Sequence, residues 1–233
     1  KIRYILSTIL IAFPLFVAGQ SITLGSCTTH DGGEYSGEMQ GGKPHGKGKT
    51  VFPDGNLYEG DYFRGLRHGY GIFKFFDGER YEGEWYKDHQ HGQGTYYFLN
   101  NNKYVGLWYI DVQQGQGIMY YYNGDIYEGD WENDRRHGNG KYTFHNGAYY
   151  DGQWVNDKKN GKGKYDWGDG STYDGDSVRT NATDEDFRYA DGDVYVGQWK
   201  DDVQHGKGIY KFQNGDTYEG EYVNGERTGT GNL

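Results

Sequence analysis

The chain has 233 residues and a formal net charge of −10, and 41 of its residues are glycine and 25 are tyrosine. Aliphatic residues are scarce, so any core must be built from aromatic rings. An acidic surface of this kind repels nucleic acid and anionic lipid headgroups, and we expect neither as its partner.

The first 26 residues differ from the rest of the chain. Lys1 and Arg3 precede an almost unbroken apolar run from Tyr4 to Ala18. The run has the charge and length of a secretory signal and is short for a membrane span. We therefore predict a signal peptide or membrane-targeting leader over residues 1–26. Its expected consequence is export to the cell envelope, with the chain either anchored at a membrane or secreted.

Cys27 is the only cysteine and begins a segment, residues 27–33, that we expect to be a tether. It follows Leu24-Gly25-Ser26, which resembles the lipobox at which bacterial lipoproteins are cleaved and acylated on cysteine. Lipidation of Cys27 would hold the chain at a membrane, and the lack of a second cysteine favours it. The alternative is ordinary cleavage after Val17-Ala18-Gly19, which leaves Cys27 as an incidental thiol.

From residue 34 onward the sequence repeats. A tyrosine followed two residues later by glycine occurs nine times, at Tyr35, Tyr58, Tyr81, Tyr104, Tyr127, Tyr150, Tyr173, Tyr195 and Tyr218. Seven of these tyrosines are spaced by 23 residues, and the last two follow steps of 22 and 23. A fixed period of this size indicates a linear array of one supersecondary unit. We predict nine repeats over residues 34–233, the seventh degenerate and the ninth truncated.

Each repeat is predicted to be a β-hairpin. In Tyr127-Glu128-Gly129-Asp130-Trp131 the large rings alternate with acids, and rings alternate again up to Phe144. Alternation with a period of two is typical of a half-buried strand, and the repeats are too short and glycine-rich for helices. Consecutive hairpins predict an all-β fold: one elongated antiparallel meander of about 17 strands, roughly 80 Å long at about 4.8 Å per strand.

The turn between repeats follows from the direction in which side chains face. Phe144 and Tyr150 share one face only if residue 144 pairs with 148 and residue 142 with 150. A three-residue loop closed by a glycine in the left-handed conformation gives this pairing. Pro53-Asp54-Gly55 fits the same turn, and Asn101 replaces the glycine with the residue that next best tolerates a positive φ.

One face of the meander is expected to carry Tyr, Gly, Trp, Gly, Tyr and Phe in every repeat. The glycines leave room for the neighbouring rings, which predicts a furrow rather than a flat plane. The other face pairs acids with bases and should be solvated. Aromatic residues dominate interface energetics, and the Tyr/Trp pair is unbroken in four central repeats. We therefore predict binding residues at Tyr81, Trp85, Tyr104, Trp108, Tyr127, Trp131, Tyr150 and Trp154.

The combined pattern resembles a known repeat. Tyr-Glu-Gly-Asp-Trp, a polar loop, His-Gly-x-Gly-x-Tyr-x-Phe and then Asp/Asn-Gly is similar to the MORN repeat, named for membrane occupation and recognition nexus. The resemblance extends from Glu34 to Leu233. It implies an elongated hairpin array that acts as a scaffold or docking surface, in some relatives beside a catalytic domain. Because the nine units occupy this whole stretch, we expect no enzymatic role.

The repeat that begins at Tyr173 departs from the pattern. Ser177 stands in place of tryptophan, and Thr183 and Glu185 replace two glycines. The acidic run Asp184-Glu185-Asp186 could bind a cation or a partner, but a drifted repeat with a solvated loop is the simpler interpretation.

Five histidines occupy the same place in their repeats, namely His45, His68, His91, His137 and His205. Equivalent positions of successive hairpins lie about 9.6 Å apart, whereas zinc needs ligand atoms at about 2.0 Å. We therefore predict no metal site and no cofactor, and expect each histidine to order its own loop. Acids such as Glu59 and Glu82 recur on the solvated face, with no cleft to make them catalytic.

Three functions remain from these patterns. The favoured one is a non-enzymatic envelope scaffold that docks a protein segment in the aromatic furrow. The alternative is a glycan-binding module, because rows of Trp and Tyr beside acids and amides suit sugar stacking. An enzyme that uses the degenerate repeat is the remotest. The aromatic rings are needed first to form the core, and rings buried in a core cannot contact a ligand. This weakens both binding hypotheses.

Overall fold

The computed structural model describes residues 21–176, 180–200 and 203–232. The apolar run of the predicted leader and the Gly19 cleavage site lie outside these residues. Ser177 also lies outside them, and the acidic run 184–186 belongs to a stretch whose side chains are not described. No helix is found in the described residues, so none there is long and apolar enough to cross a membrane.

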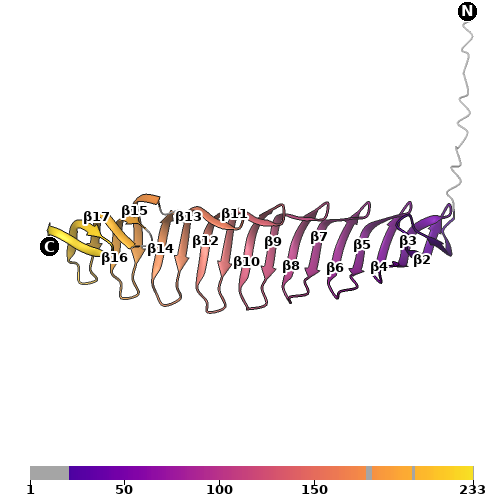
Figure 1. Cartoon of the computed structure of the whole chain (residues 1–233), viewed down its shortest axis with the longest axis horizontal. Helices are drawn as coiled ribbons and strands as arrows, with labels where there is room; N and C mark the ends of the chain where they lie inside the picture. Colours follow the sequence, from indigo (N-terminus) through magenta and orange to yellow (C-terminus); the bar gives the residue numbers. More distant parts are fainter. Residues whose placement is uncertain (1–20, 177–179, 201–202, 233) are drawn as a thin grey trace, which may run out of the picture.

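The described chain forms one antiparallel sheet of 19 strands. Each strand pairs with the next along the chain, and the strands lie side by side along one long axis (Figure 1). The predicted all-β meander is confirmed. Two strands exceed the predicted number, since β1 precedes the first repeat and β19 completes the ninth. The strands are β1 (Thr23–Thr28), β2 (Glu34–Gln40), β3 (Lys43–Val51), β4 (Leu57–Phe63), β5 (Leu66–Lys74), β6 (Arg80–Tyr86), β7 (His89–Tyr97), β8 (Lys103–Tyr109), β9 (Val112–Tyr120), β10 (Ile126–Glu132), β11 (Arg135–Thr143), β12 (Tyr149–Val155), β13 (Lys158–Asp166), β14 (Thr172–Asp176), β15 (Thr180–Arg188), β16 (Val194–Lys200), β17 (Val203–Lys211), β18 (Thr217–Val223) and β19 (Glu226–Asn232).

The structure does not follow the predicted boundary between the leader, residues 1–26, and the tether, residues 27–33. Cys27 and Thr28, expected to begin a tether over residues 27–33, are instead the last residues of β1. Cys27 lies opposite Tyr35 of β2, is half-buried and packs against the aromatic core. The physical reason is that β2 would otherwise present an unpaired edge, whose backbone groups β1 satisfies.

The predicted turn between repeats is confirmed. The amide of Phe144 donates to the carbonyl of Ala148 at 2.8 Å, and Tyr142 lies opposite Tyr150. Gly147 closes the loop with a φ of 91°, and Asn101 takes the equivalent place with a φ of 65°. This loop keeps the aromatic rings of successive repeats on one face.

The turn within each repeat is a tight two-residue turn. In the repeat of β10 and β11, Asn133 and Asp134 both have positive φ, 50° and 62°, as a type I′ hairpin requires. The amide of Asp134 donates to the carbonyl of Gln113 in the preceding repeat, and its Oδ1 accepts the Gln113 amide at 2.7 Å. Asp88, Asp111 and Asp157 make the same pair of bonds. The turn aspartates therefore join neighbouring repeats.

The tyrosines that mark the period lie over pairs of glycines. Tyr127 is fully buried, and its hydroxyl donates to the carbonyl of Asp130 at 2.9 Å. Gly129 and Gly140 face each other across β10 and β11, and a Cβ on Gly140 would overlap the Tyr127 ring. The same arrangement recurs at Tyr58, Tyr81, Tyr104 and Tyr195. The prediction that the glycines leave room for rings is confirmed.

Tryptophans join these tyrosines into a ladder. Trp131 meets Tyr127 of its own repeat and Tyr104 of the preceding one edge to face, with ring centroids 5.3 and 5.2 Å apart. Its indole N–H donates to the carbonyl of Gly117 at 3.2 Å. From Tyr35 to Trp154 the core is therefore one row of packed side chains, mostly aromatic, and a second cluster of Tyr195, Tyr218 and Tyr222 forms the core beyond the degenerate repeat.

The opposite face is not simply solvated. At the bulge in β11, the amide of Asn139 donates to Oδ2 of Asp130 at 2.8 Å. This carboxylate therefore accepts a hydrogen bond from the backbone instead of pairing with a basic side chain. Asp61 does both, since it accepts the Tyr70 amide and pairs with Lys47 at 2.7 Å. The acids of this face therefore order the strands.

Candidate functional site

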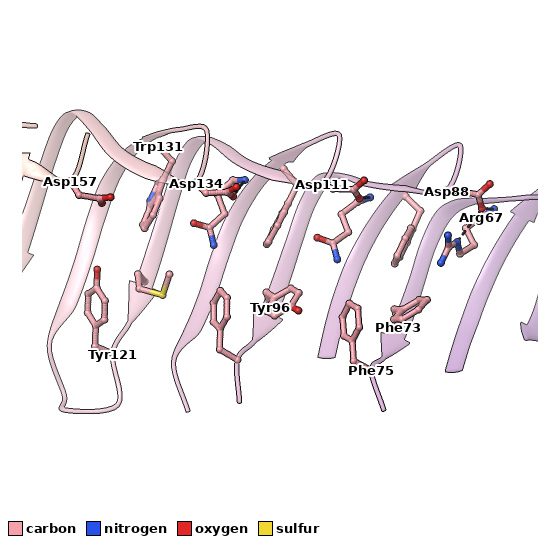
Figure 2. A pocket seen from close by; sticks show the side chains of 16 residues that line it. Arg67, Phe73, Phe75, Asp88, Tyr96, Asp111, Tyr121, Trp131, Asp134 and Asp157 are labelled. Carbon is pink, nitrogen blue, oxygen red and sulfur yellow. Dashed lines mark hydrogen bonds and ion pairs between the residues drawn. The ribbon is translucent and has the colours of Figure 1, made fainter. Parts of the chain in front are cut away.

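A groove of about 770 Å³ runs along the central repeats, from Arg67 to Asp157, on the aromatic face. Figure 2 shows the carboxylates of Asp88, Asp111, Asp134 and Asp157 in one row along the array. A second row opposite holds the rings of Phe75, Tyr96 and Tyr121, and Trp131 stands in the first row between Asp134 and Asp157. The groove thus has an acidic rim, formed by aspartates of the I′ turns. Its other rim is aromatic and is formed by residues close to the loops between repeats.

The predicted binding residues divide into two groups. Tyr81, Tyr104 and Tyr127 are fully buried and Tyr150 is 2% exposed, so these tyrosines offer no surface to a partner. Trp85, Trp108 and Trp131 line the groove but expose only 4–6% of their surface. Trp154 is also buried. The tryptophans therefore form a floor for the groove while serving as core.

Two glutamines, Gln90 and Gln113, line the groove between its rims. They are 7% and 5% exposed, and no side-chain hydrogen bond is found for either amide among the described residues. The equivalent Gln204 differs, because its amide donates to the hydroxyl of Tyr189 at 2.8 Å. The residues in the place of Tyr189 are Phe75 and Phe98 in the central repeats, which have no hydroxyl to offer.

At both ends of the groove the same position holds a cation. Arg67 Nε lies 3.0 Å from Oδ1 of Asp88, and its guanidinium stacks over Trp85 at 4.9 Å. Arg136 repeats this arrangement with Asp157 at 3.0 Å and Trp154 at 4.6 Å. Because Gln90 and Gln113 replace the arginine in the two middle repeats, Asp111 and Asp134 lack such a partner. The middle of the groove is therefore more acidic than its ends.

The aromatic rim is apolar and is not poised to ionise. Burial raises the pKa of Tyr121 above its ordinary value. Burial, together with a hydrogen bond to Glu79, likewise raises the pKa of Tyr96. Both phenols remain neutral at physiological pH, so they present rings rather than charge, and the Tyr96 hydroxyl already donates to Glu79.

The histidine column lies on the other face and is built differently from the expectation. His45, His68 and His91 alternate with Phe63, Tyr86 and Tyr109, with neighbouring ring centroids 5.2–5.6 Å apart. The histidines thus link repeats through ring stacking, whereas Nδ1 of His91, His137 and His205 is buried without a hydrogen-bond partner among the described residues. No group of three or more His, Cys, Asp or Glu residues suited to a metal ion occurs among the described residues.

The acidic rim and the two glutamines were not predicted from the sequence. The sequence does carry a signal, at the position two residues after each I′ turn. In five successive repeats this position is occupied by Arg67, Gln90, Gln113, Arg136 and Lys159. Its meaning needs the fold, since the first four of these residues each meet the aspartate of the following repeat, 21 positions on.

Two solved structures show a distant similarity to this chain. The TCP10 domain of Danio rerio CPAP, in complex with a peptide of Danio rerio STIL, shares 11% identity with a TM-score of 0.48 over 85% of this chain and 84% of that chain. The SAS-4 TCP domain of Drosophila melanogaster, in complex with a proline-rich motif, shares 16% identity with a TM-score of 0.36 over 95% and 99%. At these scores neither says what this chain binds. Among curated proteins no significant match was found.

The family comparison is specific. The model of the MORN repeat matches eight segments, 35–57, 58–80, 81–103, 104–126, 127–149, 150–172, 195–217 and 218–233. The stretch it leaves out is the seventh repeat, which the sequence predicted to be degenerate, although β14 and β15 still form there. Eight matched repeats, over most of the sheet and in register with its hairpins, show that the chain belongs to the MORN repeat family.

Proposed function

We propose that the chain is a non-enzymatic scaffold whose central groove docks a segment of another protein. The observation that carries this is a long groove with one apolar rim, one acidic rim and two glutamine side-chain amides that line it and have no hydrogen bond among the described residues. Apolar surface beside a few placed polar groups is what recognition sites share. The groove spans several repeats, so it suits a chain rather than a compact molecule.

The glycan alternative has less support. Sugars bind to tryptophan by covering an open ring face. Trp85, Trp108 and Trp131 meet tyrosines edge to face and expose no more than 6% of their surface. The aromatic rings with the largest exposed fractions, Phe76, Tyr122 and Tyr109, lie outside the groove, as does Trp167 at 37%, so the groove itself offers no row of open tryptophan faces.

Replacing Gln113 by arginine tests the docking proposal. The equivalent Arg67 and Arg136 show that arginine fits this place, where the new side chain would pair with Asp134 and stack over Trp131. We expect stability to be unchanged or higher by about 0.5–1 kcal/mol. Linear peptides selected from a displayed random library on the full chain should lose about tenfold or more in affinity, measured by fluorescence anisotropy.

The matched control is Gln93→Arg, which adds the same charge at an exposed position of the opposite face, where Lys47 and Lys162 stand in other repeats. It should leave peptide binding intact. Selected peptides that bind both variants as well as they bind the natural chain would refute groove docking. Oligosaccharide binding that Gln113→Arg removes would instead establish the glycan function.

We further propose that the leader exports the chain to the cell envelope, with a lipid on Cys27 or with ordinary cleavage after Gly19. The two cleavage sites have different effects on β1. Cleavage before Cys27 removes Thr23–Ser26, which pair with β2, whereas cleavage after Gly19 keeps the whole strand. Lipidation supplies membrane binding through acyl chains, which an acidic array does not. Mass spectrometry of the mature N-terminus distinguishes the two sites.

A chain that begins at Cys27 should have a less protected edge than one that begins at Gln20. Losing most of β1 frees backbone groups of β2, so we expect faster hydrogen exchange at the β2 amides that pair with β1. Amides of β10, at the centre of the sheet, serve as the internal control. Equal protection of β2 in the two chains would mean that β1 contributes nothing to the array.

A further inference from the structure

The charges along the groove indicate which residue types a partner carries. Asp88 and Asp157 already pair with Arg67 and Arg136, each at 3.0 Å. Asp134 accepts one backbone amide on Oδ1, and Asp111 has in addition the exposed His89 at 2.6 Å from Oδ2. Because glutamines stand where the paired repeats have arginine, a cation from outside would complete the two middle sites. The fitting side chain is lysine or arginine.

The two glutamine amides that line the groove indicate a partner with free backbone groups. Gln90 and Gln113 each offer two donors and a carbonyl to the groove, and no described residue bonds them. Their counterpart Gln204 is satisfied by Tyr189. An α-helix has no free backbone groups along its length and so could not bond these amides through its backbone. An extended segment has free carbonyl and amide groups.

The spacing of the acids selects among extended conformations. Equivalent positions of successive repeats lie two strands apart, which is about 9.6 Å. A polyproline II segment rises about 3.1 Å per residue with three residues per turn, so every third side chain returns to the same side after about 9.3 Å. A β-strand places side chains on one side every second residue, about 6.6 Å apart, and does not match.

We propose that the groove binds a polyproline II segment with basic side chains three residues apart, seated on Asp111 and Asp134, while Gln90 and Gln113 bond its backbone. This inference rests on the proposed docking function and specifies its partner. The apolar rim of Phe75, Phe98 and Tyr121 contacts the remaining side chains of the segment, for which proline is suitable because it favours this conformation. The flanking Arg67 and Arg136 exclude further cations on either side.

The experiment uses the full chain and short labelled peptides with a proline-rich frame. One peptide carries two lysines three residues apart, a second carries them four apart, and a third has glutamates in their place. Fluorescence anisotropy should show about tenfold tighter binding for the first than for the second, and none for the third. Equal affinity for the two lysine spacings would overturn the conformation and register proposed here.

Asp134→Asn tests the site itself. Asparagine keeps the Oδ1 acceptor for the Gln113 amide and tolerates the φ of 62°, so the fold should be retained while the charge is lost. We expect about a fivefold or greater loss of affinity for the first peptide. Glu128→Gln, which makes the same change of charge on the exposed opposite face, should change it less than about twofold. Equal losses would mean general charge attraction and overturn the site.

These outcomes separate the inference from the docking function. If library-selected peptides bind in a manner that Gln113→Arg removes, but lysine spacing and Asp134→Asn have no effect, only the partner chemistry is wrong. If no linear peptide depends on Gln113, the docking function fails as well.

Discussion

Replacing Trp131 by alanine is expected to lower the free energy of unfolding by about 3–5 kcal/mol. The indole is 4% exposed, stacks edge to face on Tyr104 and Tyr127, and donates its N–H to the carbonyl of Gly117. Alanine removes all three contacts and leaves a cavity between two repeats. Denaturant unfolding followed by tyrosine fluorescence measures the effect.

Trp167→Ala is the matched control for this substitution. Trp167 is 37% exposed and stacks only on neighbouring rings, so the same change should cost less than half as much. Comparable losses at the two positions would mean that the ladder of rings does not carry the stability of the array. If Trp131→Ala keeps its stability but loses a docked peptide, the tryptophan is a binding residue rather than core.

Replacing Gly117 by alanine should destabilise the chain by about 2–3 kcal/mol, although only one methyl group is added. Gly117 pairs with Gly106 beneath the ring of Tyr104, and a Cβ there would overlap the ring and its hydroxyl. The backbone of Gly117 is not in the left-handed region, so the whole cost is steric. Thermal unfolding of the full chain measures it.

A second substitution checks this explanation. Tyr104→Phe removes the hydroxyl that meets the new methyl group, together with its hydrogen bond to the carbonyl of Leu107 at 3.0 Å. Alone it should cost about 1 kcal/mol. Combined with Gly117→Ala it should cost less than the sum, by about 0.5 kcal/mol or more. Strict additivity would show that the glycine serves some purpose other than room for the ring.

The local structure of each repeat could be predicted because it depends on contacts between near neighbours. The 23-residue period, the alternation of rings and the direction of Phe144 relative to Tyr150 fixed the hairpins and the loop between repeats. The type I′ turn at Asn133-Asp134 has its own sequence preference, but its bonds to Gln113 depend on how repeats stack. Those bonds position the acidic rim, so the sequence predicted an aromatic furrow but not the row of acids along it.

The site residues were only partly foreseen for a related reason. The sequence marks aromatic residues without saying which surface of each ring is covered. Tyr127 is fully buried because its own repeat supplies two glycines against which its ring packs. Strand β1 was missed because Thr23–Thr28 carries no ring pattern, and its place depends on the open edge of β2.

The hydrogen bonds between repeats also affect the entropy that is lost when a partner binds in the groove. A surface aspartate normally gives up rotamer freedom when it grips a ligand, at about 0.5–1.5 kcal/mol for an immobilised side chain. The carboxylates of Asp111 and Asp134 already lost that freedom during folding, because backbone amides of the preceding repeats hold their Oδ1 atoms at 2.7 Å. The two carboxylates of the groove are thus ordered before a partner binds. Most of the conformational entropy lost on binding therefore comes from the partner.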